Sequence, residues 1–348
     1  MSLSSVLSMS EKRAYAKFKR IVWGANDGKP VCPACGGLDH WDLVEDKKWK
    51  CRGCRKQFTV TSDTIFASHK LSFRKMLAAC AIFANGAMGV AACRLSREIQ
   101  VSYKTAFVLL HKVREAMGQD GDASPLGGVV EIDGSVFGGS MPKFPNNKEL
   151  WAEFHKKHKA AARKKIKLIV VLREREHQEA DRIARIRTFL VEKEGDAVEI
   201  ARRLVDPKAT IQADMNNEFD LLHLYFDTKR INHSECFSKD GACTNMAESF
   251  FGRMWAAEAG VYRHISGNHV HRYAQELGWR EQYRRKPNGD LFNFMIAAIG
   301  RAGPSQTMRG YWQRRKANDD GPGSNDNAPG AEVVDLLTGR KGSSSGAR

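Results

Sequence analysis

The sequence lacks the long apolar runs that secretion or membrane insertion requires. No extended apolar segment precedes the charged residues Glu11 to Arg13, so we expect no secretory signal. The longest uncharged stretch, Met76 to Cys93, is rich in alanine and interrupted by Asn85 and Gly86, which is typical of buried helices and not of a membrane span. We therefore expect a cytoplasmic protein with no membrane partner.

Acidic residues are scarce relative to basic ones. The 348-residue chain has 56 Lys and Arg against 40 Asp and Glu, which gives a formal charge of +16. This excess favours a polyanionic partner, with nucleic acid as the first candidate, although charge alone does not distinguish DNA from RNA or a membrane surface. Because 42% of the residues are hydrophobic, the chain can bury a substantial core, which excludes a wholly disordered protein.

A disulfide framework is not expected, although the chain has eight cysteines. Four of them, Cys32, Cys35, Cys51 and Cys54, form two Cys-x2-Cys pairs separated by fifteen residues. Four thiolates complete a tetrahedral shell that suits structural Zn²⁺ and leaves no open position for catalysis. Apolar residues between and after the pairs predict the short strands of a zinc ribbon over residues 28–62, preceded by a helical lead over residues 1–27. Unrelated surface cysteines or another metal are the alternatives.

The next region, residues 70–120, has the pattern of a helix-turn-helix. Ser102 is placed to cap its second helix, whose inward face holds Ala106, Leu109, Leu110 and Val113. The first turn of that helix offers Tyr103, Lys104 and Thr105 to a DNA groove. The alternative interpretation is a plain helical hairpin that does not contact DNA.

Residues 127–286 predict an α/β domain. Strand patterns at residues 129–133, 166–172 and 183–191 precede a helix at 196–204 and a further strand at 210–214. This order is typical of the RNase H-like fold, a mixed sheet flanked by helices. A basic insertion at residues 140–165 is expected to contact phosphates, with a solvated loop as the alternative. Residues 287–348 are expected to form a C-terminal extension, largely disordered from about residue 304.

Two carboxylates end predicted strands of this domain. Asp133 shares one side of its strand with Glu131, because Val130 and Ile132 point to the other side, and Asp214 ends the last strand in the same way. A carboxylate at the end of a buried strand is unfavourable unless it is paired or coordinated. Paired divalent ions such as Mg²⁺ or Mn²⁺ prefer oxygen ligands and promote phosphodiester cleavage and strand transfer. Asp133 and Asp214 are therefore candidate metal ligands.

A third ligand is expected from the helix that begins near Thr244, which is placed to cap it. Glu248 lies on one stripe of this helix with Asn245 and Gly252, and Arg253 is placed to reach a phosphate. A surface ion pair is the competing interpretation of Glu248. Glu276 is a rival third acid, but it lies four residues from both Arg272 and Arg280, so a structural ion pair explains it more simply.

Taken together, these segments resemble the bacterial insertion-sequence transposases in which a zinc ribbon precedes an ISXO-like DDE transposase domain. The resemblance covers about residues 15–286. It is carried by the cysteine pairs, by Val130-Glu131-Ile132-Asp133-Gly134 with Phe137-Gly138-Gly139, by Asn232-His233-Ser234, by Thr244-Asn245-Met246-Ala247-Glu248-Ser249-Phe250-Phe251, and by Gly260-x-Tyr262-x-His264-x-Ser266.

This resemblance implies a transposase that cleaves and joins double-stranded DNA at the terminal inverted repeats of its own mobile element. It implies Asp133, Asp214 and either Glu248 or Asn245 as the catalytic metal-binding set, with His233 as a neighbour. Glu248 is preferred because a carboxylate binds Mg²⁺ better than an amide does. We expect a nucleoid-associated protein that forms a homo-oligomer on DNA.

The chain departs from the family pattern at two positions. Gly134 stands where the family commonly has Glu, and Trp255 stands where it has a basic residue. Neither position is an expected metal ligand. The departures leave open a catalytically inactive or repurposed DNA-binding regulator, and a repair nuclease of similar fold is a third hypothesis.

Overall fold

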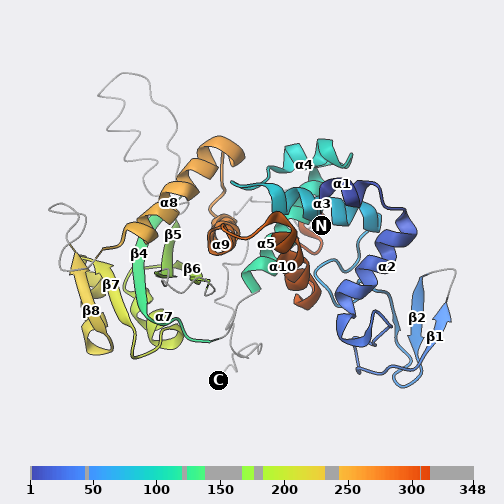
Figure 1. The fold of residues 1–348 in the computed structure, drawn as a ribbon, viewed down its shortest axis with the longest axis horizontal. Helices are drawn as coiled ribbons and strands as arrows, with labels where there is room; N and C mark the ends of the chain where they lie inside the picture. The colour runs from blue at the N-terminus through green and yellow to red at the C-terminus, as the bar shows by residue number, and fades with distance from the viewer. Residues whose placement is uncertain are drawn as a thin grey trace, which may run out of the picture.

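The computed structural model describes residues 2–43, 47–119, 124–137, 167–175, 183–231, 243–305 and 307–313. The basic insertion at 140–165, His233 and the chain after residue 313 lie outside the described residues. Figure 1 shows a sheet with α7 and α8 at one end of the molecule, the strands β1 and β2 at the other end, and α5, α9 and α10 between them.

The larger sheet has five strands in the order β6-β5-β4-β7-β8. Its antiparallel half is formed by β4 (Val129–Phe137), β5 (Lys167–Glu174) and β6 (Ile186–Val191). After α7 (Asp196–Leu204), strand β7 (Thr210–Asp214) pairs in parallel with β4, and β8 (Asp227–Ile231) pairs in parallel with β7. This mixed sheet confirms the predicted RNase H-like fold class.

Both faces of the sheet are covered by helices. On one face, Val130 and Ile132 of β4 pack in a core with α7 and the 3₁₀ helix η3 (Asn217–Leu224). On the other face, α8 (Asn245–Ala257), the π-helix η4 (Glu258–Tyr262) and α9 (Val270–Gln282) form a second core with Phe137 of β4. Because strand side chains alternate, Glu131 and Asp133 lie on the α8 side, as predicted.

The N-terminal half forms a single core with the small sheet. Strands β1 (His40–Leu43), β2 (Lys48–Cys51) and β3 (Gln57–Phe58) pair antiparallel in order. The helices around them are α1 (Leu3–Leu7), α2 (Glu11–Val22), η1 (Gly24–Asn26), α3 (Phe73–Asn85), α4 (Ala92–Glu98) and α5 (Tyr103–Gln119). The alanine-rich stretch is indeed a buried helix, α3. In the part of the chain described here, no helix has the length and apolar character needed to cross a membrane.

The C-terminal region is more ordered than the sequence suggested. Helix α10 (Asn288–Arg301) contributes Phe292 and Met295 to the N-terminal core, so it is not a separate extension. Within the segment predicted to be largely disordered from about residue 304, residues 307–313 are described: Met308 is only 2% exposed, and Trp312 packs beside Phe107 of α5. Apolar and aromatic side chains after Pro304 therefore outweigh its polar composition.

Helices α5 and α9 are joined by a buried ion pair. Nε of Arg114 lies 2.6 Å from a carboxylate oxygen of Glu276, and Arg280 donates to the other oxygen at 2.9 Å. The Glu276 side chain is fully buried, and burial raises the pKa of its carboxyl, but the two guanidinium groups outweigh burial and lower it. The structure therefore places Glu276 in a structural ion pair. The predicted partner Arg272 is wrong, because that side chain pairs with Glu115 of α5.

Replacing Glu276 tests this connection. Glu276→Gln should lower the free energy of unfolding by about 3–5 kcal/mol, since it leaves two buried guanidinium groups without a counter-charge. Urea denaturation measures the change. Glu199→Gln is the matched control, because Glu199 also contacts two arginines but is 51% exposed, and it should leave the midpoint unchanged. Equal midpoints for the parent and both variants would contradict the role of the buried pair.

Candidate functional site

Asp133 and Asp214 lie side by side on adjacent parallel strands. Asp214 ends β7, whereas Asp133 lies in the middle of β4, so the prediction that Asp133 ends its strand is wrong. The pairing of β4 with β7 ends at Ile132 and Ala213, and each aspartate is the next residue along its strand. Each carboxylate accepts a hydrogen bond from the following backbone N–H, at 2.8 Å from Gly134 and at 2.6 Å from Met215. The sheet therefore brings together two acids that are 81 positions apart in the sequence.

Helix α8 carries Glu248 over the same end of the sheet. The backbone N–H groups of Met246 and Ala247 donate to one oxygen of Glu131, at 2.8 and 2.9 Å. The predicted cap is therefore wrong in its acceptor: Thr244 is the N-cap residue, but its side chain makes no capping hydrogen bond. A buried carboxylate from β4 occupies that position instead. Asn245, the other candidate for third ligand, is the exposed first residue of α8.

The electrostatics of Asp133 show that the acids share one field. Burial raises the pKa of its carboxyl, and the charges of Glu248, Asp214 and Glu194 raise it further, against one hydrogen bond from Gly134 that lowers it. The result is a pKa of about 7 in place of the usual 3.8. Glu248 thus lies close enough to Asp133 for their charges to interact, as its prediction as the third metal ligand requires.

Glu194 is an acid at this site that the sequence interpretation missed. It lies between β6 and α7, and burial together with Glu218 and Asp214 raises its pKa. A Cβ atom added at Gly134 would lie 2.8 Å from an oxygen of Glu194. The departure from the family pattern at Gly134 was therefore a usable signal, because the missing side chain leaves room for another carboxylate.

This donor set fits a hard divalent cation. Asp133, Asp214, Glu248 and Glu194 offer only carboxylate oxygens, which are the ligands that Mg²⁺ and Mn²⁺ prefer. Among the described residues, however, only the cysteines form a group of three or more whose ligand atoms all lie within 4.8 Å of one another. The carboxylates are therefore close enough to interact but are more widely spaced than a closed coordination shell.

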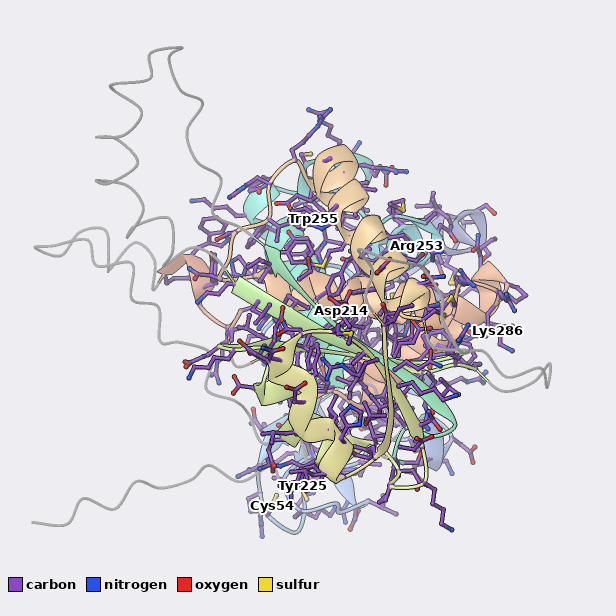
Figure 2. The ribbon with its side chains drawn as sticks, turned by 90° about the vertical axis from the view of Figure 1, so that its left-hand side faces the viewer. Cys54, Asp214, Tyr225, Arg253, Trp255 and Lys286 are labelled. Carbon is purple, nitrogen blue, oxygen red and sulfur yellow. The ribbon has the colours of Figure 1, made fainter. Side chains whose placement is uncertain are left out.

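Two further side chains of α8 bear on the predicted site, and Figure 2 shows the helix crossing above Asp214 with Arg253 and Trp255 on it. Arg253 forms an ion pair with Glu281 of α9, so its predicted contact with a DNA phosphate stays a prediction. Trp255 is 45% exposed and stacks on Phe137 with the ring centroids 4.2 Å apart. An aromatic surface thus stands where the family has a basic residue.

The helix pair predicted to bind DNA is present, with the expected inward face. Ser102 accepts a hydrogen bond from the Thr105 N–H at 3.2 Å, and Tyr103 is 51% exposed. Lys104 lies over the ring of Trp312, 5.3 Å from its centroid, so the C-terminal segment covers part of the first turn. The DNA contacts of Tyr103, Lys104 and Thr105 stay a prediction.

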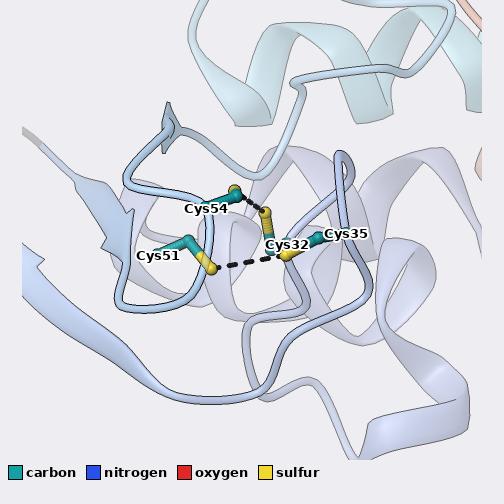
Figure 3. A group of neighbouring side chains, drawn as sticks. All are labelled: Cys32, Cys35, Cys51 and Cys54. Atoms are coloured by element: carbon teal, nitrogen blue, oxygen red, sulfur yellow. Dashed lines mark hydrogen bonds between the residues drawn. The ribbon is translucent and has the colours of Figure 1, made fainter.

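The four cysteines of the two Cys-x2-Cys pairs converge as predicted (Figure 3). The sulfur atoms of Cys32 and Cys54 are 3.5 Å apart, as are those of Cys35 and Cys51. Burial raises the pKa of the Cys32 thiol, but the backbone N–H groups of Ala34 and Cys35, with the neighbouring thiols, bring it down to about 7. Four close sulfur ligands, one of them readily ionised, support structural Zn²⁺.

Comparison with protein families agrees with both parts of this geometry. Residues 125–282 match the ISXO2-like transposase domain, and residues 9–57 match the transposase zinc-ribbon domain. The chain belongs to this transposase family. The ribbon match begins before the first cysteine and includes α2, which agrees with the shared core of the lead and ribbon in this transposase. No match was found among curated proteins.

The raised pKa of Asp133 predicts a pH-dependent penalty on folding. Because the folded pKa of about 7 exceeds the ordinary 3.8, stability present at low pH is lost as the pH rises through this window. With zinc retained and no Mg²⁺ or Mn²⁺ added, Asp133→Asn should become progressively more stable than the parent between about pH 4 and about pH 7. Urea midpoints across this range measure the effect. A constant difference in midpoint would argue against the shared field.

The cysteine cluster predicts that the zinc bound per chain depends on its four cysteines. Cys51→Ser should lower the bound zinc per chain and disturb the contact between Trp23 and Trp49, whose ring centroids are 5.1 Å apart, because metal binding stabilises this small unit. Metal analysis and tryptophan fluorescence measure both effects. The control is Cys93→Ser, an exposed thiol outside the cluster, which should retain zinc. Loss of zinc from both variants to the same extent would contradict the assignment.

Proposed function

We propose that this transposase binds the terminal inverted repeats of its own insertion sequence and catalyses strand cleavage and strand transfer with divalent metal ions. The observation that carries the proposal is the placement of Asp133 and Asp214 on adjacent parallel strands, with the charge of Glu248 acting on Asp133. The family match supplies the reaction class, because the matched domain is a transposase domain.

The acids of the sheet have the principal roles in this proposal. Asp133, Asp214 and Glu248 hold Mg²⁺ or Mn²⁺, with Asn245 as the second candidate for the third position. When bound, such ions activate an attacking oxygen and stabilise the departing oxyanion. The carboxylates also repel a phosphate approaching without metal, so cleavage is tied to the loaded site.

DNA recognition is assigned to the N-terminal half. The excess of basic residues provides attraction for the DNA backbone, and the first turn of α5 supplies Tyr103, Lys104 and Thr105 for a groove. Arg253, beside the acids, is assigned to a phosphate near the scissile bond. Because a transposition event joins two element ends, we expect a homo-oligomer assembled on double-stranded DNA.

A catalytically inactive or repurposed DNA-binding regulator is the second candidate. Trp255 favours it, because an exposed aromatic ring replaces a basic side chain beside the acids. The two candidates differ in one measurable property, since a regulator binds the element ends but does not cut them.

Substituting the paired aspartates tests the catalytic proposal. Asp133→Asn and Asp214→Asn should each lower Mg²⁺-dependent cleavage of element ends by at least about a hundredfold. DNA binding should be unchanged or tighter, because each variant removes a negative charge near a phosphate. Cleavage of a labelled duplex and an electrophoretic binding assay give the two readouts.

Asp227→Asn is the matched control, because Asp227 begins the neighbouring strand β8 and lies opposite Thr210, at the far end of β7 from Asp214. It should cut at the parent rate. Parent-rate cleavage by Asp133→Asn would overturn the catalytic assignment, and absence of cleavage by the parent chain on its own element ends would favour the regulator.

A further inference from the structure

The chain just before Glu248 is held by side chains from three strands of the sheet. Glu131 of β4 accepts the N–H groups of Met246 and Ala247, and Gln212 of β7 accepts the N–H of Cys243 at 3.1 Å. Arg173 of β5 donates to the carbonyl of Met246 at 2.8 Å. The start of α8 is therefore fixed to the strands that carry Asp133 and Asp214.

Glu131 has the most direct connection between the candidate ligands. It lies two residues before Asp133 on β4, and its hydrogen-bond partner Met246 lies two residues before Glu248 on α8. Its side chain is fully buried, so its position is set by these contacts and not by solvent. A single carboxylate thus links the backbone elements that carry two of the three acids.

Two contacts partly offset the cost of burying the Glu131 charge, although burial still raises the pKa of its carboxyl. The first-turn N–H groups of α8 point at one oxygen, where the helix dipole favours a negative charge. The other oxygen lies 3.5 Å from Nε of Arg175, a side chain that also donates to Gln212 at 3.3 Å. Shortening the Glu131 side chain would release α8 from β4 and leave its first-turn N–H groups without their acceptor.

We propose that Glu131 is a positioning residue that sets the separation of Asp133 and Glu248, and so the affinity of this site for divalent cations. The proposal rests on the proposed function, in which these two residues are metal ligands. Glu131 does not itself contact the metal. It acts by holding the first turn of α8 against β4.

A merely structural role is the competing explanation, and Glu174 provides a matched control for it. Glu174 of β5 is also fully buried, accepts backbone N–H groups from Gly127 and Arg185 at 2.8 and 2.9 Å, and pairs with the Arg185 guanidinium. None of these partners belongs to α8 or is a candidate ligand. Loss of either carboxylate should destabilise the fold, but only loss of Glu131 should affect the metal site.

The experiment compares Mn²⁺ binding by the full-length, zinc-loaded chain and its variants. Free Mn²⁺ is measured by electron paramagnetic resonance during titration, and thermal midpoints are recorded for every variant. Glu131→Ala should weaken Mn²⁺ binding by roughly tenfold, whereas Glu174→Ala should lower the thermal midpoint but leave Mn²⁺ affinity at the parent value. Glu131→Gln should restore most of the affinity, since a single amide oxygen can accept both N–H groups.

Unchanged Mn²⁺ affinity in a folded Glu131→Ala would overturn the proposal, as would a loss of affinity that Glu174→Ala shares. If Glu131→Ala does not fold, Glu131→Gln and Gln212→Ala decide instead. Parent Mn²⁺ affinity in Glu131→Gln, together with a raised Mn²⁺ requirement for cleavage in Gln212→Ala, supports the positioning role. Parent values in both variants reject it. Asp133→Asn separates the two proposals. If it binds Mn²⁺ and cuts like the parent, the proposed function fails, whereas loss of both with a parent-like Glu131→Ala rejects the positioning role alone.

Discussion

Mutual repulsion among carboxylates is the constraint on which this structure depends. Asp133, Asp214, Glu248 and Glu194 interact at one end of the sheet, and their charges help to raise the pKa of Asp133 to about 7. A cluster of like charges tends to push its supporting elements apart. The protein opposes this tendency with hydrogen bonds from three strands to the start of α8, so the scaffold and not the acids themselves keeps the acids together.

Buried arginines connect the helices beyond the site by hydrogen bonds and ion pairs. Arg173 bridges the Met246 carbonyl of α8 and Glu281 of α9, and Arg114 joins α5 to α9 through Glu276. The guanidinium group suits these positions because it remains charged and offers several donors in a fixed geometry. The chain of contacts runs from the acids through α9 to α5. It connects the candidate catalytic site to α5, the helix proposed to bind DNA.

The zinc ribbon is part of this arrangement and not an appended module. Its residues Cys51 and Phe58 share one hydrophobic core with α2, α3 and α5, and α10 completes that core from the other end of the sequence. An added Cβ at Gly300 of α10 would lie only 3.0 Å from the carbonyl oxygen of Ile21, which shows how closely the two ends pack. We therefore expect metal binding by the ribbon to stabilise a core that also includes residues of α4 and α5.

Local patterns in the sequence were sufficient for several features. The Cys-x2-Cys spacing predicted the sulfur cluster, and alternation along residues 129–133 placed Glu131 and Asp133 on one face, because spacing and strand periodicity are properties of neighbouring residues. The succession of three strands, a helix and a fourth strand along residues 129–214 also followed from the sequence patterns, whereas β8 and the order of strands within the sheet did not. The family resemblance, carried by short motifs, was confirmed by the domain matches.

Other features were decided only when distant segments came together. Glu194 lies near the other acids, and Glu131 is the acceptor at the start of α8 in place of Thr244. Arg272 pairs with Glu115 of α5 and not with Glu276 on its own helix. The packing of residues 307–313 likewise depends on an aromatic side chain of α5, Phe107, which lies more than two hundred positions before Trp312. Sequence periodicity reports which face of an element is buried. The element that packs against that face, and the oppositely charged side chains that pair, depend on the packing of elements far apart in the chain.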